Sequence, residues 1–598
     1  MISDRTPQGS SAVRIPIAPS EDAIRGRVAA ARARLEAEAG IESTPQQAFK
    51  RPVERGFTRA DRDHTTLVFG GLTWKHDNLI RGAWEGLGYK CEVVPSPDVN
   101  AFQLGKEYGN NGQCNPTYFT VGSLVQFLQH KRDKEGLSAA EIVDRYVFLT
   151  AGACGPCRFG MYEAEFRLAL RNSGFEGFRV MLFQQSGGLT QSEAEQGLDM
   201  NLDFFLGMLN AMMTGDLINE LAYQIRPYEL NPGQTDRVLE ESMQYLVDTM
   251  RERKNPGVEG ALESFLTKTG KKATGNLIVK FVDQLRTSYY TDALEEVRRR
   301  FEQIPVDYTR CKPIVKITGE FWAQTTEGDG NFNMFRFLQQ EGAEVLVEPI
   351  ATWINYMTHQ ARQKIRDRRG LEEGASEPAA WRLDHQLKRE MNWRKRVQRL
   401  NFVEVIFRRE YDRMRAALGN TCHGLADQPE LTRSGHPFYN SRAGGGEGHL
   451  EVAKAIYYTN HELAHMVLSV KPFGCMPSTQ SDGAQSAVTS RFKDLIYLPV
   501  ETSGEGEINA HSRVQMALGE AKFRAKDEYA RALAAGGVPL DEIKAWVDAH
   551  PEFRNPLRPV PKYKGFISKG ANFVLHVSET IRRERGNAAP VAELAAAH

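Results

Sequence analysis

The sequence predicts an α/β protein with two Rossmann-like parallel-sheet lobes and helical insertions. Apolar strand patterns alternate with amphipathic helix patterns over 63–190, stop over 191–310, and resume over 311–530. Strands that alternate with helices form parallel, doubly wound sheets. With 598 residues the chain is also too long for a single hydrophobic core.

The same patterns divide the chain into five parts. The start is polar, then helix-forming and then charged, which indicates an appendage to the first lobe. The segment 352–418 is rich in Lys and Arg, and its charged helices are interpreted as solvated faces. The parts are an appendage (1–62), a first lobe with a Cys-x-x-Cys motif (63–190), a helical region (191–310), a second lobe with a long basic helical insertion (311–530, insertion 352–418) and a C-terminal helical tail (531–598).

Within the first lobe, alternating apolar runs and Gly-terminated helix patterns give four strands and three helices. In the helical region the strand signal is lost. In the second lobe the pattern resumes on both sides of the basic insertion. The predicted elements are strands 65–71, 89–95, 145–152, 178–184, 311–318, 343–349, 466–474 and 494–500, and helices 74–88, 120–132, 162–175, 202–225, 292–304, 333–342 and 449–461.

Composition excludes several classes of protein. Lys and Arg (76) balance Asp and Glu (76), so no global charge favours nucleic acid or an acidic membrane. The chain has no run of 18 apolar residues and no apolar segment near Met1, so we expect a cytoplasmic protein that neither binds nor crosses a membrane. Seven cysteines disfavour a disulfide framework and leave thiols for metal or redox chemistry.

The most informative motif is Cys154-Gly-Pro-Cys157, which follows a strand and precedes a helix. Next to Arg158 and a helix N-terminus, a thiol is expected to have a lowered pKa. The pair fits cluster ligands, a redox dithiol or structural thiols. Without a second Cys-x-x-Cys, zinc is disfavoured. Arg158 would offset negative charge at such a site or lie exposed.

Two further cysteines have similar surroundings. Cys114 precedes a Pro and a helix, and Cys475 lies in a Pro- and Gly-containing turn after a strand. Three such segments suggest one shared site that only the fold can assemble. By contrast, Cys91 is expected in the core, Cys311 precedes a strand, and Cys422 lies in TCHGL, where a ligand role is the minority alternative.

Two other motifs were weighed. His461-Glu-Leu-Ala-His465 matches a zinc-protease pattern, but the helix is predicted to end near His461, so a zinc site is rejected. A glycine-rich loop precedes this same helix. It lacks the Gly-Lys-Ser/Thr of a P-loop, so any ATP hydrolysis would belong to another chain. A substrate phosphate or carboxylate could rest on its free amides. Its glycines are Gly444, Gly445, Gly446 and Gly448.

The segments GKEYGNNGQCNPTYFTVGSLVQFL, TAGACGPCRFGMYEAEFRLAL and KPFGCMPS resemble the 2-hydroxyacyl-CoA dehydratase superfamily, in particular the dehydratase-like region of activase-related and double-cubane cluster proteins. The resemblance covers about 64 to 530. It implies a 4Fe-4S cluster or an 8Fe-9S double cubane, with Cys114, Cys157 and Cys475 at the ligand positions. Cys154 is a further candidate ligand, although the family more often has a non-thiol residue there.

The resemblance also implies a function. The chain would be an iron-sulfur oxidoreductase or radical dehydratase component that receives low-potential electrons from a separate ATP-hydrolysing activase. Its substrate would be a small molecule or an acyl-CoA, and a homodimer is one assembly that fits. The alternatives are a subunit of a 2-hydroxyacyl-CoA dehydratase and a non-catalytic electron relay or scaffold.

Overall fold

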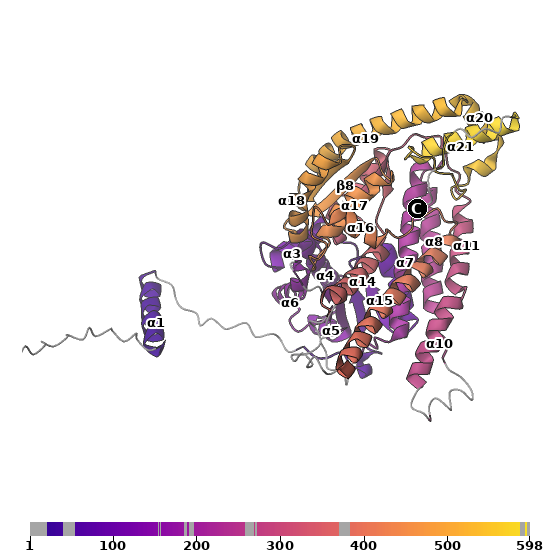
Figure 1. Cartoon of the computed structure of the whole chain (residues 1–598). Coiled ribbons are helices and arrows are strands. Elements are labelled where there is room, and N and C mark those ends of the chain that lie inside the picture. Colours follow the sequence, from indigo (N-terminus) through magenta and orange to yellow (C-terminus); the bar gives the residue numbers. More distant parts are fainter. Residues whose placement is uncertain are drawn as a thin grey trace, which may run out of the picture. The chain divides into compact units, whose positions relative to one another are not determined.

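The fold was analysed in a computed structural model, which describes residues 21–39, 54–152, 155, 157–184, 188–189, 197–257, 268, 272–369, 383–586 and 592–594 (Figure 1). The chain divides into two units, Met1–Val53 and Glu54–His598. In the described part of the first unit lies one helix, α1 (Glu21–Glu38). The separate unit is shorter than the expected appendage, because Arg55 already bonds to Asp144 beside the first sheet.

The first lobe is built on a sheet of order β2-β1-β3-β4-β5. Strands β1 to β4 are parallel, and the two-residue β5 pairs antiparallel with β4. Apolar side chains of α4 and α6 pack on one face, and those of α2 and α7 on the other. The elements are β1 (Thr66–Phe69), α2 (Trp74–Glu85), β2 (Lys90–Val93), α3 (Val99–Tyr108), α4 (Asn115–Asp133), α5 (Ala139–Arg145), β3 (Tyr146–Gly152), α6 (Tyr162–Asn172), β4 (Arg179–Gln184) and β5 (Gly188–Leu189).

The second lobe contains a fully parallel sheet of order β7-β6-β8-β9. Its first strand lies between the second and third, as in the first lobe, so both sheets have the doubly wound order that the sequence predicted. Apolar residues of α13 and α19 cover one face. The elements are β6 (Ile314–Gly319), α12 (Phe321–Thr325), α13 (Met334–Gln340), β7 (Glu344–Leu346), α14 (Ile350–Asp367), α15 (Leu383–Ala417), α16 (Gln428–Gly435), α17 (Gly448–Asn460), β8 (Met466–Pro472), α18 (Met476–Arg491) and β9 (Ile496–Thr502).

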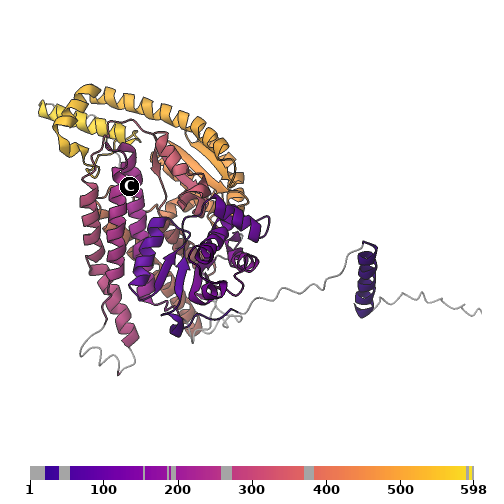
Figure 2. The same cartoon turned by 180° about the vertical axis from the view of Figure 1, so that it is seen from behind.

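Helices connect and flank the lobes. In Figures 1 and 2, α7 (Leu202–Ile225), α8 (Gln234–Glu252), α10 (Lys272–Arg286) and α11 (Tyr289–Phe301) stand side by side. The long helix α19 (Glu507–Gly536) passes over the second sheet to α21 (Lys569–Glu584), which also contacts α20 (Leu540–Ala549). No helix in the described part of the chain is long and apolar enough to span a membrane.

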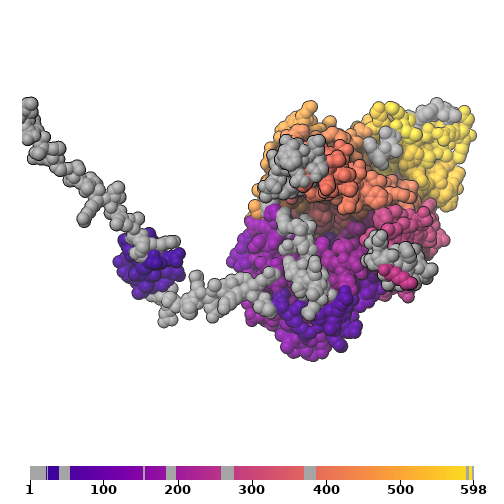
Figure 3. Space-filling model, turned by 60° about the horizontal axis from the view of Figure 1, so that its bottom comes forward, coloured from indigo at the N-terminus to yellow at the C-terminus, as the bar shows by residue number. Residues whose placement is uncertain are grey.

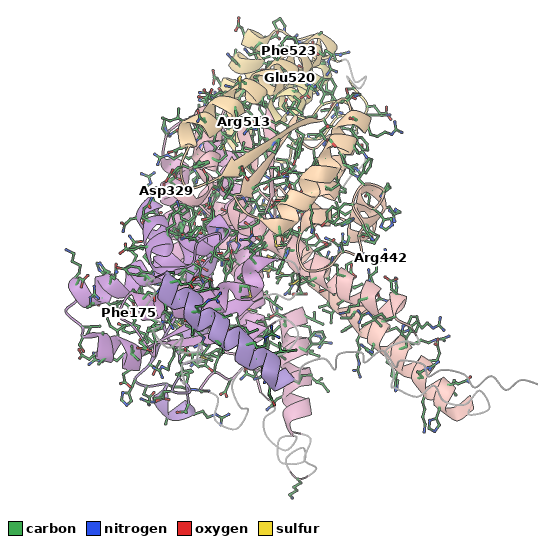
Figure 4. All side chains as sticks on the ribbon, turned by 90° about the vertical axis from the view of Figure 1, so that its left-hand side faces the viewer. Phe175, Asp329, Arg442, Arg513, Glu520 and Phe523 are labelled. Carbon is green, nitrogen blue, oxygen red and sulfur yellow. The ribbon has the colours of Figure 1, made fainter. Side chains whose placement is uncertain are left out.

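The two lobes are joined by polar and aromatic contacts. Asp329 of the second lobe accepts a hydrogen bond of 3.0 Å from the amide of Val99, and Figure 4 shows it where the lobes meet. Phe119 packs against Trp322 with ring centres 5.4 Å apart. In Figure 3 the purple surface of the first lobe adjoins the orange surface of the second. A site built from both lobes is therefore held by direct packing.

Candidate thiol site

The three cysteines singled out by their motifs lie at the ends of structural elements. Cys157 follows β3 and Cys475 follows β8, so the two occupy equivalent positions after the third strand of each sheet. Cys114 and Cys475 are the residues immediately before α4 and α18, and each helix has a Pro in its first turn. Ligands of doubly wound folds bind at the carboxyl ends of the strands, which is where these residues lie.

Backbone contacts bring the cysteine segments together. A Cβ atom on Gly474, which has φ +77°, would lie 3.3 Å from the Cα of Cys114. The amide of Asn115 donates to the carbonyl of Phe473 at 3.1 Å. These contacts place the Cys114 turn of the first lobe directly on the Cys475 turn of the second.

The glycine-rich loop makes the corresponding contact with the Cys157 turn. The Cys157 amide donates to the carbonyl of Gly445 at 3.1 Å. A Cβ on Gly155 would lie 2.4 Å from the Cα of Gly445, and one on Gly446 would lie 2.5 Å from Pro477. Only glycine permits such a close approach of two backbones. Protein therefore covers Gly445 and Gly446, whereas Gly444 is open and Gly448 begins α17.

Two carboxyl groups lie near the cysteines, the half-buried Glu320 and the buried Glu447, and the motif analysis did not find them. Glu320 follows β6 directly and accepts from the amide of Ala323, and Glu447 accepts from the amide of Phe321 at 2.9 Å. Burial and the proximity of Glu447 raise the pKa of Glu320, and burial raises the pKa of Glu447. The sequence could have indicated them, because Glu320 is an acidic residue at the end of a predicted strand and Glu447 lies inside the glycine-rich loop.

The expectation of a low thiol pKa is wrong. Burial and then the charge of Glu447 raise the pKa of Cys157 to about 12. Burial followed by Glu320 also raises the pKa of Cys475, and burial raises that of Cys114. Desolvation disfavours a thiolate more strongly than a helix N-terminus favours it. Without a metal these thiols are protonated at neutral pH, so metal binding has to release protons.

The three thiols share their electrostatic environment. Glu320 raises the pKa of Cys114, Cys157 and Cys475 alike, and Cys114 contributes to the shift at Cys157. Cys114 and Cys475 are buried and Cys157 is half-buried. The fold therefore brings the three cysteine turns together, although Cys157 and Cys475 are about 320 residues apart in the sequence.

Polar neighbours orient one of the sulfurs. The Sγ atom of Cys114 lies 3.2 Å from the hydroxyls of both Thr117 and Tyr162. Arg158 donates a hydrogen bond to the carbonyl of Gly112 and so links the Cys157 turn to the Cys114 loop. The Arg158 guanidinium therefore bonds to a backbone carbonyl.

The remaining motif residues lie elsewhere. Cys154 is outside the described residues. Cys422 is buried with its thiol donating to Leu217, and the Cys311 thiol donates to Ala525. Cys91 lies in β2, half-buried against the core.

The interpretation of the His461 motif is confirmed in its geometry. Helix α17 ends at Asn460, and His465 immediately precedes β8. His461 pairs with Glu430 at 2.7 Å and His465 with Glu528 at 3.3 Å. The two imidazoles therefore do not share one helical face.

The donor set at the site consists of thiols, the ligands that iron-sulfur clusters use. Within the described ranges, no three His, Cys, Asp or Glu side chains are arranged to hold a single metal ion.

Fold and site together define a class: two-lobed α/β proteins whose thiols meet at the carboxyl ends of two parallel sheets. No family model matches the chain, and no curated protein matches it.

Proposed function

We propose that this chain is an iron-sulfur redox protein of the 2-hydroxyacyl-CoA dehydratase superfamily, with a cluster held by Cys114, Cys157 and Cys475. The observation that carries the proposal is the direct contact between the turns that bear Cys114, Cys157 and Cys475, which backbone hydrogen bonds and close glycine contacts join. No carboxylate-only or histidine-rich set would suit a soft, sulfur-rich cofactor as well.

The surrounding residues fit such a group. When bound, a cluster supplies one-electron transfer at a potential set by burial and by hydrogen bonds to sulfur. Burial of Cys114 and Cys475 excludes water from the ligands. The hydroxyls of Thr117 and Tyr162 are placed to donate to the Cys114 sulfur.

The rim of the site favours an external electron donor. Met161, Phe473 and Met476 flank the cysteines and are 57, 56 and 41% exposed. Exposed apolar side chains grouped at a functional site are typical of docking surfaces. The partner in this proposal is an ATP-hydrolysing activase of the dehydratase-activator type.

The carboxyl groups near the cysteines favour a second candidate function, a subunit of a 2-hydroxyacyl-CoA dehydratase. Burial and the proximity of Glu447 raise the pKa of Glu320 to about 8, so Glu320 holds a proton at neutral pH, and burial raises the pKa of Glu447 above its ordinary value. A positioned, protonated carboxyl group can protonate a departing hydroxyl. In that role the substrate would be an acyl-CoA, and in the first a small molecule.

The experiment is anaerobic purification and reconstitution with iron and sulfide analysis. We expect about four irons per chain for a cubane, or about eight for a double cubane. Cys157→Ser should lose iron and colour. Cys422→Ser is the matched control, because Cys422 is also a buried cysteine but lies outside the site.

Two results would contradict the ligand assignment. One is zinc without labile sulfide in the wild-type protein. The other is equal iron content in Cys157→Ser and Cys422→Ser. Addition of a dehydratase activase with ATP then separates the two functions, since acyl-CoA dehydration indicates the subunit and reduction of a small molecule alone indicates the reductase.

A further inference from the structure

A second site is present away from the cysteines. A cavity of about 770 Å³ lies between the loop 419–426, the segment 556–569 and Tyr457 and Tyr458 of α17. None of the three proposed cluster ligands lines it. Its volume is within the range of small-molecule sites.

The cavity wall carries a surplus of positive charge. It contains two carboxylates, of which Asp412 lies 3.5 Å from Arg415 and Glu344 accepts a hydrogen bond from Tyr228. Against them stand five cationic side chains. These are Arg408, Arg415, Arg558, Lys562 and Lys569.

Three of these cations form no close ion pair in the described part of the chain, although Glu344 of the same wall acts at longer range on Lys569. Among the described residues, Arg558, Lys562 and Lys569 form no ion pair within 4.0 Å, although other pairs are numerous across the chain. Arg558 stacks on Phe553, and the Lys562 ammonium donates to the carbonyl of Glu462. Cations without a close ion pair in one cavity favour the binding of an anion from outside the chain.

Lys569 has a special position among them. It is the first residue of α21, where the helix dipole is positive, and its ammonium lies 4.9 Å from the centre of the Tyr308 ring. An anion in the cavity would therefore meet the full charge of Lys569, whereas the amides of Ile567 and Ser568 before the helix already donate to Glu528.

His423 adds an oriented polar group. Its Nδ1 lies 2.5 Å from Oε1 of Glu220, and the same oxygen accepts the His423 amide at 2.8 Å. Glu220 is buried, so it fixes the ring and leaves Nε2 for another partner.

Part of the wall is apolar and flat. It is formed by Tyr457, Leu463, Pro559, Val560 and Pro561. Aromatic and proline rings offer a contact surface for a flat apolar body.

We propose that this cavity binds a small molecule that carries an oxyanion, carboxylate or phosphate, on a flat apolar body. The oxyanion lies by Lys569 and Arg558, His423 Nε2 makes a further hydrogen bond, and the apolar body lies on the Tyr457 and proline wall. The site is separate from the thiol site and does not depend on the function proposed there.

The test is calorimetric titration of the full chain with phenyl phosphate, benzoate and inorganic phosphate. We expect one equivalent of phenyl phosphate or benzoate to bind, and inorganic phosphate to bind about tenfold more weakly because it lacks the apolar body. Which organic probe binds more tightly distinguishes a phosphate from a carboxylate ligand.

Variants locate the binding. Lys569→Met and Arg558→Gln should each weaken the organic probe about tenfold or more, since each removes one charge-assisted contact. The matched control is Lys544→Met, a change at an exposed lysine outside the cavity. Circular dichroism checks that each variant is folded. If only one of the two cavity variants folds, its affinity is compared with that of Lys544→Met.

Three results would overturn the proposal. The first is no binding of either organic probe up to about 10 mM. The second is equal affinity in the control and in the folded cavity variants. The third is inorganic phosphate binding as tightly as phenyl phosphate. Cys157→Ser should bind the probe as the wild type does, which keeps this test independent of the thiol site.

Discussion

The buried ion cluster around Glu348 makes a sharp prediction about stability. Oε2 of Glu348 lies 2.6 Å from the ammonium of Lys316 in β6 and 3.6 Å from that of Lys454 in α17. The side chains are 4, 0 and 3% exposed. Tyr458 also donates to this oxygen at 3.2 Å. One carboxylate thus offsets part of the positive charge of two buried lysines and ties the second sheet to a helix that covers it.

Glu348→Gln should cost about 3 to 5 kcal/mol, because it leaves both ammonium groups buried without a counter-charge. The surface pair Glu341–Lys522, at 3.3 Å with side chains 31 and 36% exposed, gives the matched control. Glu341→Gln should cost less than about 1 kcal/mol. Adding Lys316→Met to Glu348→Gln should recover part of the loss, because one unpaired charge is removed.

The same cluster predicts a pH dependence. The lysines lower the pKa of Glu348 from 4.5 to about 2 in spite of its burial. Because the folded pKa is below the unfolded value, this stabilisation is complete above pH 4.5 and is lost as pH falls towards 2, about 3 kcal/mol in all. Burial lowers the pKa of Lys316 from 10.5 to about 8, so stability should rise with pH between those values.

Urea denaturation followed by circular dichroism and tryptophan fluorescence measures these effects as shifts in midpoint. The two signals together show whether the lobes unfold at once. A Glu348→Gln midpoint equal to that of Glu341→Gln would refute the reasoning. So would an unchanged acid dependence between pH 4.5 and 2 in Glu348→Gln.

Further changes test other parts of the fold. Gly319→Ala should destabilise strongly, because the residue has φ +122° and its Cβ would lie 2.0 Å from the carbonyl oxygen of Val470, whereas Gly483→Ala in an open helix position should be neutral or stabilising by about 1 kcal/mol. Thermal midpoints of the two variants make that comparison. Burial opposes the ionisation of Glu528, but His465 and hydrogen bonds from Ile567 and Ser568 together lower its pKa, so Glu528→Gln should destabilise fully above about pH 4.5 and progressively less as pH falls below that value. Thermal scans at pH 7 and pH 4 test this, and an equal loss at both would count against the pairing.

Much of the fold could be predicted from periodicity. The apolar run 202–225 matches α7 (Leu202–Ile225), and the strands after Thr65 and Lys312 occupy the predicted places. The helix α3 (Val99–Tyr108) was not predicted, because its short sequence has few apolar repeats and only the Asp98 cap marks its start. The tail boundary at 531 falls inside α19, because that helix contains no Pro and continues through Gly519 to Gly536.

The site was predictable in its cysteines but not in its electrostatics. Pro and Gly turns after strands marked Cys157 and Cys475, and these turns do lie at strand ends. The raised thiol pKa values come first from burial of the thiols and then from the charges of Glu320 and Glu447. The local sequence around Cys157 shows the helix N-terminus beside the thiol. It does not show Glu447, which the second lobe contributes.

The division of the thiols between lobes has a consequence for biosynthesis. Cys475 leaves the ribosome about 320 residues after Cys157, so the three sulfurs can meet only when most of the chain has been made. Any cofactor that needs all three sulfurs must therefore be inserted after translation is nearly complete. A chain that carries the complete cofactor must therefore have both lobes folded.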